Sequence, residues 1–297
     1  MTDFAVAANE RMLGAALVAT SAAVFGLAGV LTKSIHADPL TINCWRGFIG
    51  GVLIAAYVLY RRDGAAARSL RLGWRGWLLA IIGACASIAF IAAFKNTYVA
   101  NVAIIYATAP FVAAVLGRLL LRERPRARTM LAAVASLAGV ALMVSAGLGT
   151  GRPFGDGLAL LMTAGSALYL VLIRKFRDTP VVWAGAVSGL LLFILGWLVT
   201  DPLAISMRDG VLLAAFGASF AVASVVWTEG ARLIPAAEAG LLGAAEVPFA
   251  ILFGWVFLAE IPPSASLAGG AAVLAAVFAH AGHDWLAARR PGSAPQG

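Results

Sequence analysis

The chain carries a similar pattern twice, and this internal duplication constrains the possible folds more than any other feature of the sequence. The segment Leu78–Ala84 (LLAIIGA) returns as Leu212–Ala218 (LLAAFGA). Other matched pairs keep nearly the same separation: Gly47 and Gly51 with Gly185 and Gly189, Pro110-Phe111 with Pro248-Phe249, and Glu123-Arg124-Pro125 with Glu260-Ile261-Pro262. Each copy contains five long apolar stretches. Because five is an odd number, the second copy would cross a membrane in the opposite sense to the first, which gives an inverted repeat.

The apolar stretches are numerous and long enough to place the chain in a lipid bilayer. Of its 297 residues, 62% are hydrophobic and 12% are charged, whereas soluble domains have about half and about a quarter. A helix needs about 20 apolar residues to cross the hydrocarbon core. Ten stretches approach that length: Met12–Thr32, Leu40–Tyr60, Trp74–Phe94, Tyr98–Leu121, Thr129–Ala146, Gly155–Ile173, Val181–Thr200, Gly210–Thr228, Glu238–Leu258 and Ser266–Leu286. The sequence therefore predicts an all-α membrane protein of ten transmembrane helices, arranged as two inverted five-helix repeats.

The basic residues gather on one side of this ten-span arrangement. With a cytoplasmic N-terminus, one group faces the cytoplasm: Arg11, Arg61, Arg62, Arg68, Arg71, Arg75, Arg122, Arg124, Arg126, Arg128, Arg174, Lys175, Arg177, Arg232, Arg289 and Arg290. The opposite side holds a smaller group: Lys33, Lys95, Arg152 and Arg208. This asymmetry follows the positive-inside rule and predicts that both termini are cytoplasmic. It also explains the net charge of +8 without a nucleic-acid partner.

The domain organisation follows from the repeat. We expect a first five-helix repeat at residues 12–147, a second, inverted repeat at 155–286, and a disordered cytoplasmic tail at 287–297, which is polar and contains proline and glycine. No connection between spans is longer than Arg61–Gly73, so no soluble domain fits between them. The functional residues are therefore expected inside the helix bundle.

Polar residues inside the spans are the candidates for a binding site, because ionisable groups are costly in a bilayer and usually face a cavity or a partner. Arg46 either binds a substrate carboxylate as a planar fork or has a structural role, in which it caps carbonyls and pairs with Glu246. Glu246 precedes Pro248, which breaks helical hydrogen bonding. Its carboxyl either recognises an amine or takes up a proton, or it is held as a packing element. Asn101 either joins neighbouring helices or contacts substrate. Arg118 is expected to reach the interface.

Aromatic and acidic residues supply further candidates. An apolar wall with hydrogen-bonding groups is expected from Tyr98, Tyr106, Tyr169, Trp45, Phe90, Phe94 and Trp227; the alternative is that these side chains mark the membrane interface or pack against lipid. Near the end of the last span, His280, His283 and Asp284 share a helix face, where interfacial solvation is favoured over a metal site. Glu123 and Glu260 lie just beyond the fourth and ninth spans and are expected to serve the start of the following helix.

The sequence lacks the motifs of the common catalytic machineries. It contains no G-x-x-x-x-G-K-[ST] loop for ATP, no G-x-S-x-G nucleophile elbow and no H-E-x-x-H pair. Cys44 and Cys85 both lie in apolar spans, where a thiol acts as a small hydrophobic group. We therefore expect no enzyme activity, no cofactor and no metal.

The order of these residues resembles a known family. The residues that carry this resemblance are Arg46 after Pro39, Asn101 followed by Pro110 and Glu123, and then Pro248 and Glu260. From Met12 to Leu286 the chain is similar to the ten-span EamA-type members of the drug/metabolite transporter superfamily. Within that group it is similar to the YddG-type exporters of amino acids, including aromatic ones. This resemblance implies two inverted repeats and efflux across a bacterial inner membrane.

The resulting hypothesis is a monomeric secondary transporter whose two halves surround a central cavity and expose it to each side in turn. Its substrates are expected to be amino acids and related small metabolites. Arg46 or Asn101 would bind the carboxylate, Glu246 the ammonium group, and the aromatic residues the side chain. The alternatives are a transporter for drugs or other metabolites, an ion channel and an intramembrane enzyme.

Overall fold

The structure is a computed structural model of the chain. It describes residues 2–61, 72–122, 127, 130–131, 134–135, 137–142, 152–176, 179, 181–234, 239 and 242–288. Residues 129, 132–133, 136 and 143–146 of the expected fifth span (Thr129–Ala146), the repeated segment at Glu123-Arg124-Pro125, and the tail beyond Ala288 lie outside the described residues, as do the side chains of His280, His283 and Asp284.

The described residues form helices without strands. The first half contains α1 (Thr2–Gly26), α2 (Ala28–Ser34), α3 (Pro39–Arg61), α4 (Gly73–Asn96), α5 (Val99–Ala107) and α6 (Ala109–Leu121). The second half contains α8 (Pro153–Lys175), α9 (Val181–Val199), α10 (Met207–Leu233), α12 (Glu246–Leu258) and α13 (Ser264–Ala288). The all-helical prediction is confirmed for this part of the chain. Helix α13 continues through the first two residues of the segment that was expected to be a disordered tail.

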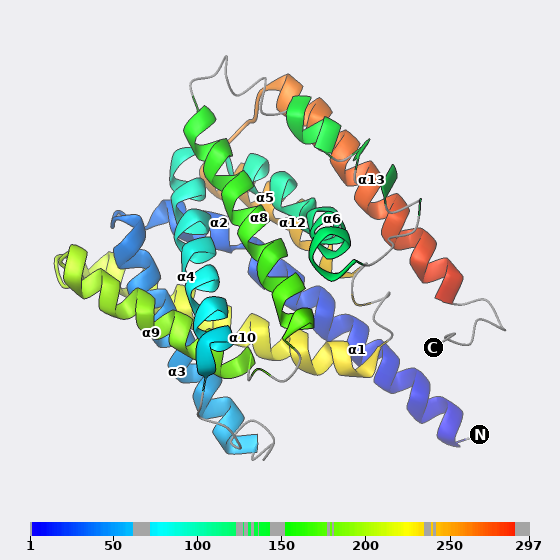
Figure 1. The fold of residues 1–297 in the computed structure, drawn as a ribbon, viewed down its shortest axis with the longest axis horizontal. Coiled ribbons are helices and arrows are strands. Elements are labelled where there is room, and N and C mark those ends of the chain that lie inside the picture. The colour runs from blue at the N-terminus through cyan, green and yellow to red at the C-terminus, as the bar shows by residue number, and fades with distance from the viewer. Residues whose placement is uncertain are drawn as a thin grey trace.

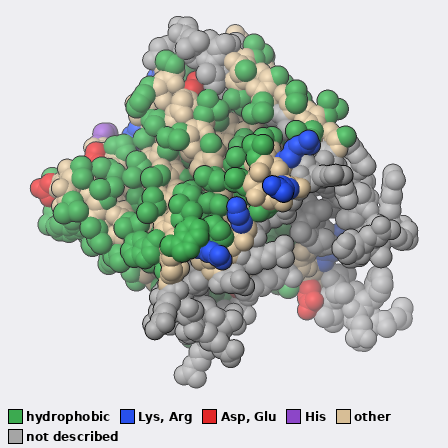
Figure 2. Space-filling view, in the orientation of Figure 1, with side chains coloured by type: hydrophobic (Ala, Val, Ile, Leu, Met, Phe, Trp, Pro, Cys, Tyr) green, Lys and Arg blue, Asp and Glu red, His purple; other side chains and the backbone are tan. Residues whose placement is uncertain are grey.

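Several helices have the length and composition of membrane spans. In the described residues, six stretches qualify: Glu10–Ser34, Pro39–Tyr57, Gly73–Asn96, Val99–Leu121, Pro153–Ile173 and Met207–Ala231. Shorter apolar helices lie at Ala184–Val199, Glu246–Leu258 and Leu267–Ala279. Hydrophobic side chains cover most of the face shown in Figure 2, with charged side chains in a few small groups. An apolar outer surface is expected where lipid, rather than water, is the solvent.

Three of the expected continuous spans are interrupted within the bundle. The fourth is divided at Thr108 between α5 and α6, where Pro110 stands at the start of α6 and lacks the N–H that would continue the ladder. The first is divided at Leu27 between α1 and α2. Helix α12 begins at Glu246, after a turn at residues 244–245. Pro248 explains that start, because a proline is favoured in the first turn of a helix.

Close approach at small residues holds the helices together. Helices α1 and α10, α4 and α8, and α3 with both α9 and α10 pack along much of their lengths (Figure 1). A Cβ added at Gly217 of α10 would lie 2.7 Å from Cβ of Ile49 on α3, and one added at Gly196 of α9 would lie 2.7 Å from Cβ of Cys44. Neither position has room for a methyl group. Between helices in lipid, such contacts replace the hydrophobic drive that operates in water.

The repeated glycines lie on the facing helices α3 and α9. A Cβ added at Gly47 would lie 3.6 Å from Cα of Gly189, whereas one added at Gly51 or at Gly185 would meet no atom within 4 Å. The two helices therefore approach closely near Gly47 and Gly189 and leave space on the other side of that crossing.

Candidate functional site

A pocket lies where the helix interruptions meet. Its walls come from α1 and α2, α4, α5 and α12, through Phe25, Gly26, Ala28, Gly29, Phe90, Phe94, Val102, Ala103, Tyr106, Glu246, Val247 and Ala250. Gly26 is the last residue of α1, Tyr106 is in the last turn of α5, and Glu246 is the first residue of α12. Discontinuous helices commonly build the substrate sites of secondary transporters, because a broken helix exposes backbone groups inside the membrane.

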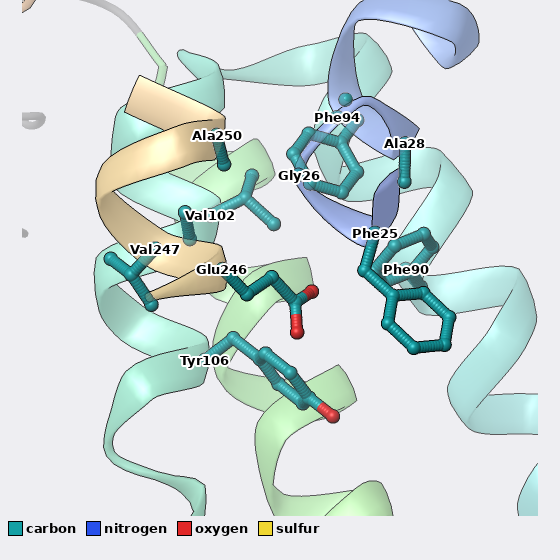
Figure 3. A pocket seen from close by; sticks show the side chains of 12 residues that line it. Phe25, Gly26, Ala28, Phe90, Phe94, Val102, Tyr106, Glu246, Val247 and Ala250 are labelled. Atoms are coloured by element: carbon teal, nitrogen blue, oxygen red, sulfur yellow. The ribbon is translucent and has the colours of Figure 1, made fainter. Parts of the chain in front are cut away.

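Glu246 is the charged residue of this pocket. Its carboxylate points into the cavity, with Tyr106 beside it and the rings of Phe25 and Phe90 opposite, as Figure 3 shows. The described residues provide no ion pair to this carboxylate, because the pairs recorded among them are Lys33–Glu260 and His36–Asp209. An acidic group among apolar walls is suited to bind a cationic ligand group, because the positive charge compensates a carboxylate that has lost its water.

Phe90 connects the pocket to a second charged site, centred on Arg46 of α3. The Arg46 guanidinium carbon lies 5.7 Å from the ring centre of Phe90, 5.4 Å from that of Phe216 and 5.1 Å from that of Phe220. The Phe220 ring in turn packs edge-on against Phe25 of the pocket, with ring centres 6.2 Å apart. The pocket around Glu246 and the ring of side chains around Arg46, called the two compartments below, therefore share the Phe90 side chain.

Polar contacts hold Arg46 from one side only. Its Nη2 donates to Ser87 Oγ on α4 and lies 3.4 Å from Asn43 Oδ1. Its Nε is buried and has no hydrogen-bond partner among the described residues. The structural alternative for Arg46, a pair with Glu246, is absent from the described ion pairs. Its role as a substrate residue stays a prediction.

Asn101 lies apart from the pocket in a buried polar cluster. Its Nδ2 donates to Asp156 at the start of α8, 3.1 Å from Oδ1. The Thr97 hydroxyl donates to the same carboxylate oxygen over 2.7 Å. Asp156 is fully buried and in the first turn of α8, where the helix dipole favours an acidic group. This geometry is that of a connection between α5 and α8.

Four of the predicted aromatic residues also lie outside the pocket lining. Trp45 Nε1 donates to the Pro202 carbonyl over 2.8 Å. Tyr98 precedes α5, and the Arg152 guanidinium lies 4.3 Å from its ring centre. Tyr169 packs in an apolar cluster with Leu79 and Leu172. Trp227 belongs to another cluster around Val18 and Ile234. Of the ten polar and aromatic candidates, the pocket therefore brings together Glu246, Tyr106, Phe90 and Phe94, and Arg46 adjoins it through Phe90.

Glu260 joins three spans at one end of the bundle. Its carboxylate forms an ion pair with Lys33 at the end of α2, and its Oε2 accepts from the Val99 backbone N–H over 2.9 Å. The expectation that Glu260 serves the following helix is wrong, because the N–H that it accepts from belongs to the start of α5. Nearby, Lys95 Nζ donates to the Ile35 carbonyl. The ion pair, the bond to Val99 and this neighbouring Lys95–Ile35 bond are together called the Glu260 contacts below.

Sequence reasoning missed several residues of both compartments. Phe25, Gly26 and Gly29 line the pocket through ring, backbone and close packing, and such roles leave no polar signal in a sequence. Asn43 gave a signal that was overlooked, since it lies one helical turn before Arg46 and so shares its face. The described residues contain no group of three or more potential metal ligands.

The long apolar helices define a polytopic membrane protein, and a pocket lies at the helix interruptions. Comparison with known sequences agrees: residues 12–145 and, separately, 153–280 match the EamA-like transporter family. The chain therefore belongs to the EamA-like transporter family, within the drug/metabolite transporter superfamily, and is a multi-pass membrane transporter. This membership points away from an enzyme.

Individual relatives are consistent with this assignment. The chain is similar to an uncharacterized transporter of Archaeoglobus fulgidus, with 29% identity over 273 residues that cover 89% of this chain and 95% of that protein. It also shares its fold with a protein of known crystal structure, at a TM-score of 0.64 and 23% identity, with coverage of 93% of this chain and 98% of the other.

Proposed function

We propose that this protein is a monomeric secondary transporter that exports amino acids, including aromatic ones, and related small metabolites across a bacterial inner membrane by alternating access. One observation carries the proposal: Arg46 and Glu246 are opposite charges in compartments that share Phe90, and among the described residues neither has an ion-pair partner. A zwitterion supplies the missing counter-charges.

Each part of an amino acid has a matching partner in this geometry. The ammonium group would approach the Glu246 carboxylate, the carboxylate would approach the Arg46 guanidinium, and an apolar side chain would lie against Phe25 and Phe90. Both ion pairs would form away from bulk water, where they are stronger than on a protein surface. An apolar molecule without charges would leave Arg46 and Glu246 uncompensated, so it should be a poorer ligand.

The helix contacts support a twofold repeat that covers the first four spans of each half. If the two halves are repeats, α1 corresponds to α8, α3 to α9, α4 to α10, and α5 with α6 to α12, and each contact that these helices make between the two halves should have an equivalent after they are exchanged. The contact of α1 with α10 then becomes that of α8 with α4, the contact of α3 with α10 becomes that of α9 with α4, and the contact of α1 with α12 becomes that of α8 with α5 and α6. All six contacts occur. The two separate family matches agree with this division.

The arrangement of the ends is also that expected for this transport mechanism. The start of α1 and the end of α13 lie on the same side of the molecule in Figure 1, in agreement with two cytoplasmic termini. The Glu260 contacts would then lie at the extracytoplasmic end, above the pocket. They join α2, α4, α5 and the end of α12, which are pocket helices. Opening of the pocket to the outside would separate these contacts.

Transport into liposomes tests the proposal directly. Purified protein reconstituted in vesicles should move labelled phenylalanine down its gradient faster than protein-free vesicles. The test variant is Glu246→Gln, which removes the charge and keeps the shape. The control is Arg118→Gln, which removes an exposed arginine near the end of α6, away from the break at Thr108. Flux should fall with the first variant and persist with the second. A panel of amino acids with no flux above empty vesicles would refute amino acid export.

The second candidate is efflux of drugs or other metabolites. One observation favours it: the pocket itself contains one carboxylate among apolar and aromatic walls, which suits a lipophilic cation as well as a zwitterion. Competition separates the two functions. Excess unlabelled amino acid should block the flux of an amino acid exporter but leave the flux of a drug carrier unchanged.

A further inference from the structure

The contacts of Arg46 leave one edge of its guanidinium without a partner. A guanidinium carries five N–H donors in a planar fork, and a carboxylate can accept two of them at once. Here Nη2 is occupied by Ser87 and Asn43, while Nε is buried and lacks a hydrogen bond among the described residues. A buried donor without an acceptor is costly, so a side chain held in this way favours binding of an acceptor.

The occupied edge is held by a chain of hydrogen bonds. Asn43 is fully buried, and its Nδ2 donates to the Pro39 carbonyl over 2.8 Å. This bond turns Oδ1 toward Ser87, whose hydroxyl donates to it over 2.6 Å. The Ser87 oxygen is then available to accept from Arg46 Nη2. The neutral side chains of Asn43 and Ser87 therefore link the guanidinium to the Pro39 carbonyl at the start of α3 and fix its orientation.

The surroundings of the guanidinium select the kind of anion. Three phenylalanine rings lie within 5.7 Å of its central carbon. Such a cage stabilises the cation through the ring faces but gives no hydrogen bonds to a strongly hydrated dianion such as phosphate. A carboxylate with a single charge and an adjoining apolar group loses less hydration on entering the cage.

We propose that the Nε edge of Arg46 is a subsite for a monocarboxylate next to an apolar or aromatic group, and that Asn43 and Ser87 are the positioning residues of this subsite. The inference rests on the proposed function in one respect, namely that the carboxylate belongs to the transported molecule. Asn43 and Ser87 do not contact the ligand; they hold the guanidinium plane so that the Nε–H faces it.

Two probes of matched shape test the subsite without any amino group. 3-Phenylpropionate carries the carboxylate, and 3-phenylpropanamide is its neutral counterpart. Each is added to purified full-length protein in detergent, and the half-saturating concentration is read from the rise in melting temperature. The wild type should bind the acid at least about tenfold more tightly than the amide, since hydrogen bonds to charged groups contribute more than neutral ones. Equal binding of the two probes, or no binding of either, would overturn the inference.

Variants assign the preference to the named residues. Arg46→Gln should abolish the preference for the acid, and Arg46→Lys should reduce it because a flexible ammonium does not hold a donor at the fixed position of the Nε–H. Ser87→Ala should lower the ratio of acid to amide affinity, Ser87→Thr should restore it by returning the hydroxyl, and the control Arg118→Gln should keep it. A purely structural Ser87 would change the melting temperature but not this ratio. If Arg46→Gln fails to fold, Arg46→Lys and the Ser87 pair decide.

The probes also separate this inference from the proposed function. An acid preference that depends on Arg46, in a protein that gives no amino acid flux, would refute amino acid export and retain the subsite. If the wild type transports amino acids and Arg46→Gln keeps the acid preference unchanged, amino acid export is supported and the subsite is refuted.

Discussion

The ion pair between Lys33 and Glu260 should couple the two halves of the bundle measurably. Their side chains are 13% and 17% exposed, respectively, so the pair is neither fully buried nor open to solvent. Exposed pairs contribute at most about 1 kcal/mol, whereas breaking a buried pair costs about 3–5 kcal/mol. We therefore expect a coupling free energy of about 1–3 kcal/mol between these residues.

A double-mutant cycle measures this coupling. Lys33→Met keeps the length of the apolar stem, and Glu260→Gln keeps an oxygen that can accept from the Val99 N–H. The free energy of unfolding of the wild type, both single variants and the double variant is obtained by equilibrium denaturation in mixed detergent micelles. The coupling should change little between low and high salt, because partly buried charges are weakly screened.

The pair His36–Asp209 is the matched control. Its nitrogen and oxygen are 3.7 Å apart, and the His36 side chain is 71% exposed. The same cycle with His36→Gln and Asp209→Asn should give a much smaller coupling that high salt removes. Equal couplings for the two pairs, or a value for Lys33–Glu260 indistinguishable from zero, would refute the reasoning from burial.

Three further predictions use single sites. Gly155→Ala should destabilise the fold by about 1–3 kcal/mol, because the new Cβ would lie 2.6 Å from backbone at the end of α4. In the control Gly157→Ala the new Cβ meets no atom within 4 Å, so this variant should be neutral or stabilising. Thermal unfolding in detergent compares the stability of the two variants. Ser21→Ala removes the 2.7 Å hydrogen bond to the Ala223 carbonyl and should cost about 1 kcal/mol in the same assay, with Ser21→Thr as the control that keeps the hydroxyl. Glu246→Gln should lower phenylalanine flux at least about tenfold, since a charge-assisted bond to the ammonium is lost; unchanged flux would exclude Glu246 from recognition.

The helical architecture was accessible from the sequence because it depends on local properties. Apolar length predicts a span wherever it occurs, and Pro110 and Pro248 mark the breaks at α6 and α12 because a missing N–H acts at its own position. The division at Leu27 between α1 and α2 has no proline to mark it. It depends on packing against other helices, as at Gly26, where an added Cβ would lie 2.9 Å from Phe249.

The site was accessible only in part, because a side chain's chemistry is local but its direction is not. Glu246, Tyr106 and Phe90 meet in one pocket, whereas Asn101 and Tyr169 have equally suitable side chains and face other helices. Rotation of a helix about its axis decides between these outcomes. In a chain that is apolar on almost every face, the sequence carries little information about that rotation.

The acidic and basic side chains of this bundle differ in whether the described residues supply a partner of opposite charge. Asp156 receives hydrogen bonds from Thr97 and Asn101, and Glu260 is paired with Lys33. These groups lie where their partners stabilise the fold. Arg46 and Glu246 differ, since each enters an apolar compartment without an ion-pair partner among the described residues, although compensation would lower the cost of burial. Stability alone would favour pairing or replacing them. Under the proposed function the ligand brings both counter-charges, and the expected result for Arg46→Met is a protein that is more stable than the wild type but inactive in transport.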